Sequence, residues 1–224
     1  MPVGFQVGKR VITGPPAYAT LVALFLLLVG LVYFMSLDSW AWGVSGALWF
    51  AFMLYWTSAS LSSAPAKSSE TPESRRVHTR LLAAAFFLLF LPLPGLTQYL
   101  LPRTTAVHVV GLVMQLLGFA LAIAARQHLG RNWSARVRVA EDHELIQRGP
   151  YRLIRHPIYS AIILMFLGAS IAAGGIVHGL VGTAIIFGAY ARKIRIEEET
   201  LRAAFGDAYV EYSKRTWALI PFLV

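Results

Sequence analysis

The sequence predicts an all-α protein, a polytopic transmembrane bundle of about six spans with a C-terminal helical hairpin and cytoplasmic C-terminal helices. Of its 224 residues, 57% are hydrophobic and 14% are charged, whereas soluble domains carry about 25% charged residues. The mean hydropathy is +0.59. Several apolar segments reach the length of about 20 residues that a spanning helix needs. These three observations together indicate an integral membrane protein.

Four apolar segments, residues 17–37, 40–61, 81–101 and 105–126, are candidate spans. The first exceeds the roughly 7–15 residues of a signal-peptide core, so we interpret it as a retained span. A further stretch, 158–190, holds no charge and is too long for one ordinary span. Gly174 and Gly175 lie at its middle and favour a turn, which predicts two helices in a hairpin. Residues 1–104 then carry spans one to three, and residues 105–224 form a C-terminal core with spans four to six.

Two features of the N-terminal half carry specific expectations. Pro92 and Pro94 lie within the predicted third span, and we expect them to kink it because proline lacks the backbone N–H. The stretch 62–80 is rich in serine, proline and charge. That composition predicts a mobile cytoplasmic connector.

The distribution of basic residues sets the predicted orientation. With both termini in the cytoplasm, 19 of the 20 Lys and Arg residues fall inside and only Arg103 falls outside, which fits the positive-inside rule. The net charge of +9 is explained by this topology. We predict no nucleic-acid partner, because no basic, aromatic soluble domain is present.

The distinctive polar residues gather in two predicted cytoplasmic segments, 127–159 and 192–215. The hairpin leaves and returns on the same face of the membrane, so it is expected to bring both segments to one water-facing site. Pro157 suits the first turn of a helix. Arg155 and His156 would then lie at a helix N-terminus, which favours an anionic ligand group. Anchoring of this helix to lipid headgroups is the alternative for the Arg-His pair.

Three consecutive acids, Glu197, Glu198 and Glu199, mark the second segment. A solvated amphipathic helix on the membrane surface explains part of this pattern. It does not explain acids next to anionic headgroups, unless they hold a cation or an amino group. Gly206 is expected to end the helix. We predict no metal, since the chain has no cysteine and its histidines lack an HExxH-type spacing.

In order and spacing, these motifs resemble the isoprenylcysteine carboxyl methyltransferase family of integral membrane enzymes. The matching features cover about the C-terminal half of the chain: the Leu-Gly-Arg-Asn-Trp run at 129–133, His143 with Leu145 and Ile146, Gly149-Pro150-Tyr151, Arg155-His156-Pro157 with Tyr159, Glu197-Glu198, Phe205-Gly206, Tyr209, Tyr212 and Ile220-Pro221. Phospholipid N-methyltransferases and other membrane methyltransferases share a looser version of the pattern.

The resemblance implies S-adenosylmethionine (SAM) as the methyl donor, and a lipid-like or prenylated substrate that enters from the bilayer. It also implies that membrane lipids surround the chain and, through likeness to the shorter bacterial members, that it resides in the bacterial inner membrane. The implied cofactor-binding residues are Gln127, His143, Leu145, Tyr151, His156, Tyr159 and Glu198, and Arg155 joins them because a cation there can hold the SAM carboxylate. The implied catalytic residues, on the methyl-acceptor side, are Arg192 and Glu197, with Arg195 as a further cation for a carboxylate acceptor.

The acceptor stays open at this point. A carboxylate acceptor is already ionised and needs a cation, for which Arg192 or Arg195 would serve. An amine acceptor would need a base, and Glu197 is the candidate. The alternatives are a phospholipid N-methyltransferase or a small thiol or amine methyltransferase and, from other classes, a non-enzymatic membrane scaffold or an NADPH-dependent membrane reductase.

Overall fold

A computed structural model describes residues 4–7, 10–13, 40–60, 71–90, 95–96, 98–130, 144–174 and 176–220. Strands β1 (Gly4–Val7) and β2 (Arg10–Thr13) pair antiparallel, with Gly4 opposite Thr13. The predicted helical class is confirmed by the elements that follow, and this short hairpin is an addition that was not predicted. Its sequence alternates β-favouring residues such as Phe5, Val7 and Val11. The predicted span 17–37 lies outside the described residues.

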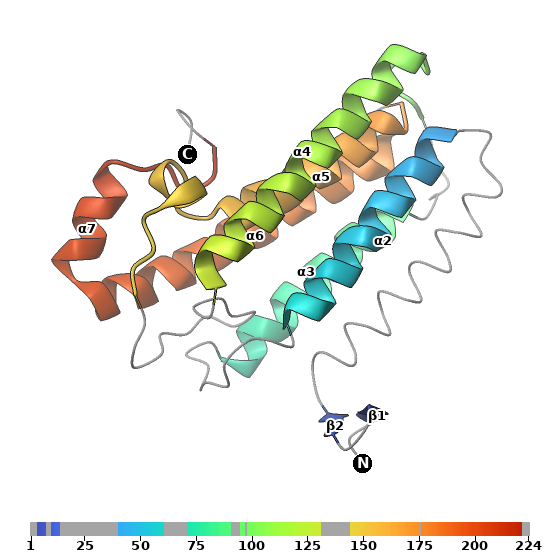
Figure 1. The fold of residues 1–224 in the computed structure, drawn as a ribbon. Coiled ribbons are helices and arrows are strands. Elements are labelled where there is room, and N and C mark those ends of the chain that lie inside the picture. Colours follow the sequence, from blue (N-terminus) through green and yellow to red (C-terminus); the bar gives the residue numbers. More distant parts are fainter. Residues whose placement is uncertain are drawn as a thin grey trace.

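Helices form the rest of the described fold (Figure 1). They are α2 (Trp40–Ser60), α3 (Pro72–Phe90), α4 (Thr105–Leu129), the short 3₁₀ helix η2 (Gly149–Arg152), α5 (Pro157–Ala172), α6 (Val177–Phe205) and α7 (Asp207–Lys214). Figure 1 shows α2 to α6 running along one common direction, with α7 folded back beyond the end of α6. Between α5 and α6 the chain turns at Gly174, whose φ is +87°. The predicted break of the long apolar stretch is therefore confirmed.

The third predicted span, 81–101, is wrong at both ends. Helix α3 begins at Pro72, so residues 72–80 are helical rather than part of the connector predicted over 62–80. Thr71 caps this start, because its Oγ1 accepts a hydrogen bond of 3.2 Å from the Ser74 N–H. At the other end residues 98–101 are not helical, and Gly95 has a φ of +85°. Pro92 and Pro94, and the kink expected there, lie outside the described residues.

Small residues let α4 and α5 pack closely. A Cβ atom on Gly111 of α4 would lie 2.2 Å from the backbone nitrogen of Ala172 on α5. A Cβ atom on Gly168 of α5 would lie 2.6 Å from the carbonyl oxygen of Gly111. Glycine at these contacts allows the two backbones to touch, as is common where helices associate in membranes. This contact fixes α5, and with it the residues that precede its N-terminus.

Replacing Gly111 by alanine is expected to destabilise the protein by about 1–3 kcal/mol, since the new methyl group meets backbone that has no free space to move into. Gly188→Ala on α6 is the matched control, because a Cβ there meets nothing within 4 Å. Thermal unfolding in detergent checks the pair. Equal melting temperatures for the two variants would contradict the close α4–α5 contact.

The outer face of α4 is strongly apolar. Among the described helices, α4 alone has the length and composition to cross a bilayer, and only 28% of its most apolar window is buried. Its exposed apolar side chains are Val109, Val110, Val113, Leu116 and Leu117. Helix α5 is apolar but has 16 residues. The apolar surface of α4 fits a lipid environment, whereas the number of spans stays a prediction.

Basic side chains separate along the bundle. Arg103 lies near the α5–α6 turn, where its guanidinium is 4.9 Å from the centre of the Tyr99 ring. At the opposite end, Arg126 of α4 donates to the Ala59 carbonyl and Arg192 of α6 donates to the Ser74 side chain. Tyr99 also bridges Ile176 at the start of α6, which places it beside the turn. Among these described residues, Arg103 lies apart from Arg126 and Arg192, whereas the orientation in the membrane stays a prediction.

Candidate functional site

The residues before α5 are held by a short C-terminal segment, residues 215–220, which we call the C-terminal strap. Backbone N–H groups of Arg155 and His156 donate to the carbonyls of Trp217 and Ala218, at 2.8 and 3.0 Å. The Trp217 N–H donates to the Leu153 carbonyl at 3.0 Å. The backbone N–H groups of Arg155 and His156 are therefore already paired with the strap. The sequence had suggested that N–H groups at this helix start would bind an anionic ligand.

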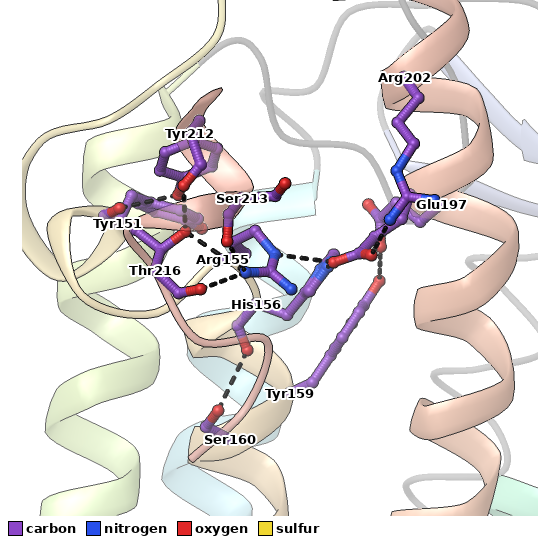
Figure 2. A network of polar contacts seen from close by, with 11 residues as sticks. Tyr151, Arg155, His156, Tyr159, Ser160, Glu197, Arg202, Tyr212, Ser213 and Thr216 are labelled. Atoms are coloured by element: carbon purple, nitrogen blue, oxygen red, sulfur yellow. Dashed lines mark hydrogen bonds and ion pairs between the residues drawn. The ribbon is translucent and has the colours of Figure 1, made fainter. Parts of the chain in front are cut away.

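Arg155 is the centre of the polar network between the strap and α6 (Figure 2). Its Nε donates to the Glu198 carboxylate at 2.8 Å. Its Nη1 donates to the Ser213 carbonyl at 3.0 Å and to the Thr216 carbonyl. With a side chain only 12% exposed, Arg155 joins three segments through one guanidinium.

Glu198 lies next to nitrogen atoms of three side chains. Besides Arg155, it lies 3.3 Å from Arg202 Nη2 and 3.4 Å from His156 Nε2. Burial by itself would raise the pKa of this carboxyl, but the hydrogen bonds and charges of His156 and Arg155 outweigh burial and lower the pKa to about 2. Glu198 is thus a fixed negative charge at neutral pH.

This depressed pKa has a consequence for acid stability. The free energy that ionised Glu198 contributes is fully present above its unfolded pKa of about 4.5 and is lost as pH falls to about 2. Between these values, the melting temperature of the wild type is expected to fall more steeply than that of Glu198→Gln. Thermal unfolding at a series of pH values measures both slopes, and parallel curves would contradict the assignment.

Glu197 has different surroundings from its neighbour. Its Oε2 accepts a hydrogen bond of 2.7 Å from the Tyr159 hydroxyl and lies 3.6 Å from His156 Nδ1. Its side chain is 28% exposed, against 12% for Glu198. Figure 2 shows Tyr159 reaching across from α5 to meet Glu197 on α6. Glu197 is therefore the more accessible carboxylate of the pair.

Aromatic rings stack beside the two carboxylates. The Tyr159 ring stacks on His156 at 5.5 Å between centroids and on Tyr190 at 4.5 Å. Lys193 Nζ lies 5.8 Å from the centre of the Tyr159 ring. A ring in this position attracts cations through its electron-rich face. Together with Glu197, Tyr159 gives the site a preference for positively charged groups.

Tyr151 is buried, and its backbone links η2 to α7. Its carbonyl accepts a hydrogen bond of 2.7 Å from the Tyr212 hydroxyl of α7. Burial raises the pKa of Tyr212 to about 12, so the hydroxyl remains a donor. Gly149, at the start of η2, has a φ of +59° and lies against the His128 ring. The predicted turn at Gly149 thus anchors η2 to α4 and α7.

Two buried polar groups in this site, His156 Nε2 and the Tyr209 hydroxyl, border the Glu198 carboxylate. Each interacts with Glu198, although outside the ordinary hydrogen-bond geometry. Buried polar atoms are nearly always paired, and here Glu198 is the partner of both.

The structure thus brings together Tyr151, Arg155, His156, Tyr159, Glu197 and Glu198. Arg192 lies five residues before Glu197 on α6 and is bonded to Ser74. Arg195 and Gln127 are exposed, Leu145 is partly buried, and His143 lies outside the described residues. No group of three or more metal-binding side chains occurs in the described ranges.

Several residues of the network were missed from the sequence. Thr216, Ser213 and Arg202 bind Arg155 or Glu198. The spacing of Arg202 four residues after Glu198 was a usable signal. Ser74 was missed because its segment was assigned to a loop, although the Thr-Pro-Glu-Ser sequence at 71–74 is a helix-start pattern.

Comparisons with known proteins extend these observations. A family model described as phospholipid methyltransferase matches residues 106–208. A probable protein-S-isoprenylcysteine O-methyltransferase of Oryza sativa subsp. indica is 31% identical over 119 residues, which is 52% of this chain and 62% of the relative. Protein-S-isoprenylcysteine O-methyltransferase B of Arabidopsis thaliana is 30% identical over 115 residues, 50% of this chain and 58% of the relative. The chain therefore spans about three fifths of these relatives.

A solved structure supports the fold. It is that of a eukaryotic intramembrane Ras methyltransferase, isoprenylcysteine carboxyl methyltransferase, and it aligns with a TM-score of 0.50 over 94% of this chain and 88% of the other. The sequence identity is 18%, so this likeness concerns the fold alone. The resemblance predicted from the motifs is confirmed, and the matched region contains the α5–α6 network.

Proposed function

We propose that this chain is a SAM-dependent membrane methyltransferase, similar to the isoprenylcysteine carboxyl methyltransferases, that methylates a carboxylate on a lipid-like or prenylated substrate. The observation that supports this most is the convergence of Arg155, His156 and Tyr159 with Glu197 and Glu198. These are the residues for which the resemblance implies roles, and they meet at one end of the hairpin. We place the chain in the bacterial inner membrane with both termini cytoplasmic.

The residues present fit the chemical groups of SAM. Its sulfur is cationic, which suits the Tyr159 ring and the Glu197 carboxylate. Its amino-acid and ribose groups would meet His156 and the Tyr209 hydroxyl, the two groups that border Glu198. Glu198, which lies beside His156, would accept a hydrogen bond from an amino or hydroxyl group of SAM. We propose that Gln127, His143, Leu145, Tyr151 and Arg155 complete the cofactor site.

When bound, SAM supplies the methyl group, and a new carbon–oxygen bond to the acceptor forms as the carbon–sulfur bond breaks and leaves a neutral thioether. The protein has to align the two reactants and exclude water. An ionised carboxylate acceptor has no proton to lose, so it needs positioning by a cation. Arg192 lies five residues before Glu197 on α6 and would serve, with Arg195 as the more exposed alternative.

A phospholipid N-methyltransferase is the second candidate, favoured by the description of the matching family model. An amine acceptor must lose a proton. Glu197 is the accessible carboxylate at the site, and it would act as the base. The two candidates share the donor site and differ in the acceptor.

Radiolabelled SAM tests the proposal. The purified protein is incubated with methyl-labelled SAM and either a native lipid extract or N-acetyl-S-farnesylcysteine. We expect a labelled product from which mild alkali releases methanol, because methyl esters hydrolyse in base. An alkali-stable label would favour the amine or thiol alternatives. No SAM binding at millimolar concentration by calorimetry would contradict every methyltransferase proposal, and binding of a nicotinamide dinucleotide instead would favour a reductase.

A further inference from the structure

Helices α3 and α6 pack against each other in an antiparallel arrangement. Near the α5–α6 turn, His178 Nδ1 lies 2.5 Å from the Leu88 carbonyl oxygen. Further along α6, a Cβ atom on Gly182 would lie 2.8 Å from the Ala85 carbonyl oxygen. The contacts therefore move toward the start of α3 as they move toward the end of α6.

The same register continues to the end of the bundle that carries the two carboxylates. There the His78 ring lies 5.5 Å from the Tyr190 ring. Ser74 Oγ accepts a hydrogen bond of 3.0 Å from Arg192 Nη2, and the Ser74 carbonyl oxygen lies 3.5 Å from Arg192 Nη1. The position of Ser74 opposite Arg192 is thus set by the packing of two long helices.

The first turn of α3 holds Ser74 in a fixed place. Its N–H donates to Thr71 Oγ1 at 3.2 Å, and the Arg75 N–H donates to the Thr71 carbonyl at 3.1 Å. Pro72 occupies the first helical position, where its fixed φ favours a helix. The Ser74 hydroxyl is therefore carried by a capped helix start.

Arg192 benefits from a second anchor because of its place on α6. Residues three or four apart share a helix face, whereas Arg192 lies five residues before Glu197. An arginine side chain is long and flexible, so its guanidinium can take many positions. A hydrogen bond to Ser74 fixes the guanidinium before an acceptor arrives, and such preorganisation favours group transfer.

The anchored charge lies close to the stacked rings of the site. Arg192 acts electrostatically on His78. Tyr190, against which His78 packs, stacks on Tyr159 at 4.5 Å between ring centroids. Ser74 therefore keeps a cation beside the rings that adjoin the two carboxylates.

We propose that Ser74 is a positioning residue for methyl transfer: its hydroxyl holds the Arg192 guanidinium in place, so that the first turn of α3 completes the acceptor side of the site. The inference rests on the proposed function and deepens it. It gives a part in the reaction to a helix outside residues 106–208, the region that the family model matches. Ser74 acts through Arg192 and does not itself touch the acceptor.

Ser74→Ala tests the hydroxyl alone. Initial rates are measured at saturating methyl-labelled SAM with N-acetyl-S-farnesylcysteine as the acceptor. We expect kcat to fall about tenfold, the effect of losing one hydrogen bond to a charged group. Alanine favours a helix more than serine does, so the melting temperature should equal that of the wild type or rise. A slower enzyme of unchanged stability is not explained by a disturbed α3.

Three further variants separate positioning from a structural effect. Ser74→Thr keeps the hydroxyl and should recover most of kcat. In an Arg192→Ala background, Ser74→Ala should change kcat by less than about twofold, because the group that Ser74 positions is gone. Thr79→Ala is the matched control, since it removes an exposed hydroxyl that bonds the Arg75 carbonyl within α3. It should have the kcat of the wild type, and SAM affinity should stay within about twofold in every variant.

Several outcomes would overturn the inference. They are a kcat within about twofold of the wild type in Ser74→Ala, an equal loss in Ser74→Thr or Thr79→Ala, and a full loss that persists in the Arg192→Ala background. A wild type that binds SAM but leaves N-acetyl-S-farnesylcysteine unmethylated would also overturn it, since no carboxylate acceptor would then need Arg192. Absence of SAM binding by the wild type would instead contradict the proposed function.

Discussion

Glu198→Ala is expected to abolish measurable SAM binding while the helices remain folded. The substitution removes a fixed negative charge and the carboxylate that Arg155 and His156 both contact. Glu198 is the proposed partner of an amino or hydroxyl group of SAM, and a hydrogen bond to a charged group contributes about 1.5–3 kcal/mol. Affinity for SAM should therefore fall by about 100-fold, as measured by calorimetry.

Glu211→Ala provides the control for this variant. Glu211 also pairs with a cation, at 2.6 Å from Lys214, but its side chain is 69% exposed. Exposed pairs contribute little, roughly 0–1 kcal/mol, so Glu211→Ala should bind SAM like the wild type. Circular dichroism and thermal unfolding verify that both variants are folded. Folded Glu198→Ala with normal SAM affinity would remove Glu198 from the donor site.

Arg192→Ala is expected to leave SAM binding within twofold and to reduce turnover by roughly 100- to 1,000-fold. The reason is that a positioned cation stabilises charge only where the acceptor reacts, a kind of contribution that reaches this size in other enzymes. Initial rates at saturating SAM measure kcat and the acceptor KM. Arg192→Lys should recover part of the rate, since it keeps the charge but not the planar fork that bonds Ser74.

Two further variants serve as comparisons for Arg192→Ala. Arg76→Ala removes an exposed arginine from the end of α3 that holds Ser74, and it should behave like the wild type. Arg195→Ala tests the other arginine that the sequence offered. A turnover loss confined to Arg195→Ala would transfer the acceptor role to Arg195, and a loss of SAM binding in Arg192→Ala would contradict the division between donor and acceptor residues.

The C-terminal half of the fold was predictable because its signals are local. Pro157, Gly174 and Gly206 mark helix ends in the sequence, and the structure places α5 and α6 between them. The start of α3 was mispredicted because the polar composition of residues 71–80 outweighed its capping pattern. There the hydrogen bond from Ser74 to Thr71 favours the helix.

For the site, the sequence identified the residues but not their partners. The pairing of Arg155 with Glu198 depends on two helices returning to the same end, which the hairpin prediction supplied. The contacts of Arg155 with Ser213 and Thr216 depend on the path of residues 213–220, for which no periodicity gave a signal. His78 was not singled out, because nothing in its local sequence reports that it packs against Tyr190.

The C-terminal strap makes the order of synthesis matter. Arg155 and His156 leave the ribosome some sixty residues before the backbone groups of Trp217 and Ala218 that they bind. A nascent chain already inserted in the bilayer would therefore lack a finished donor site. The proposed donor site would be complete only after Ala218 has left the ribosome, so a partly made copy would lack it.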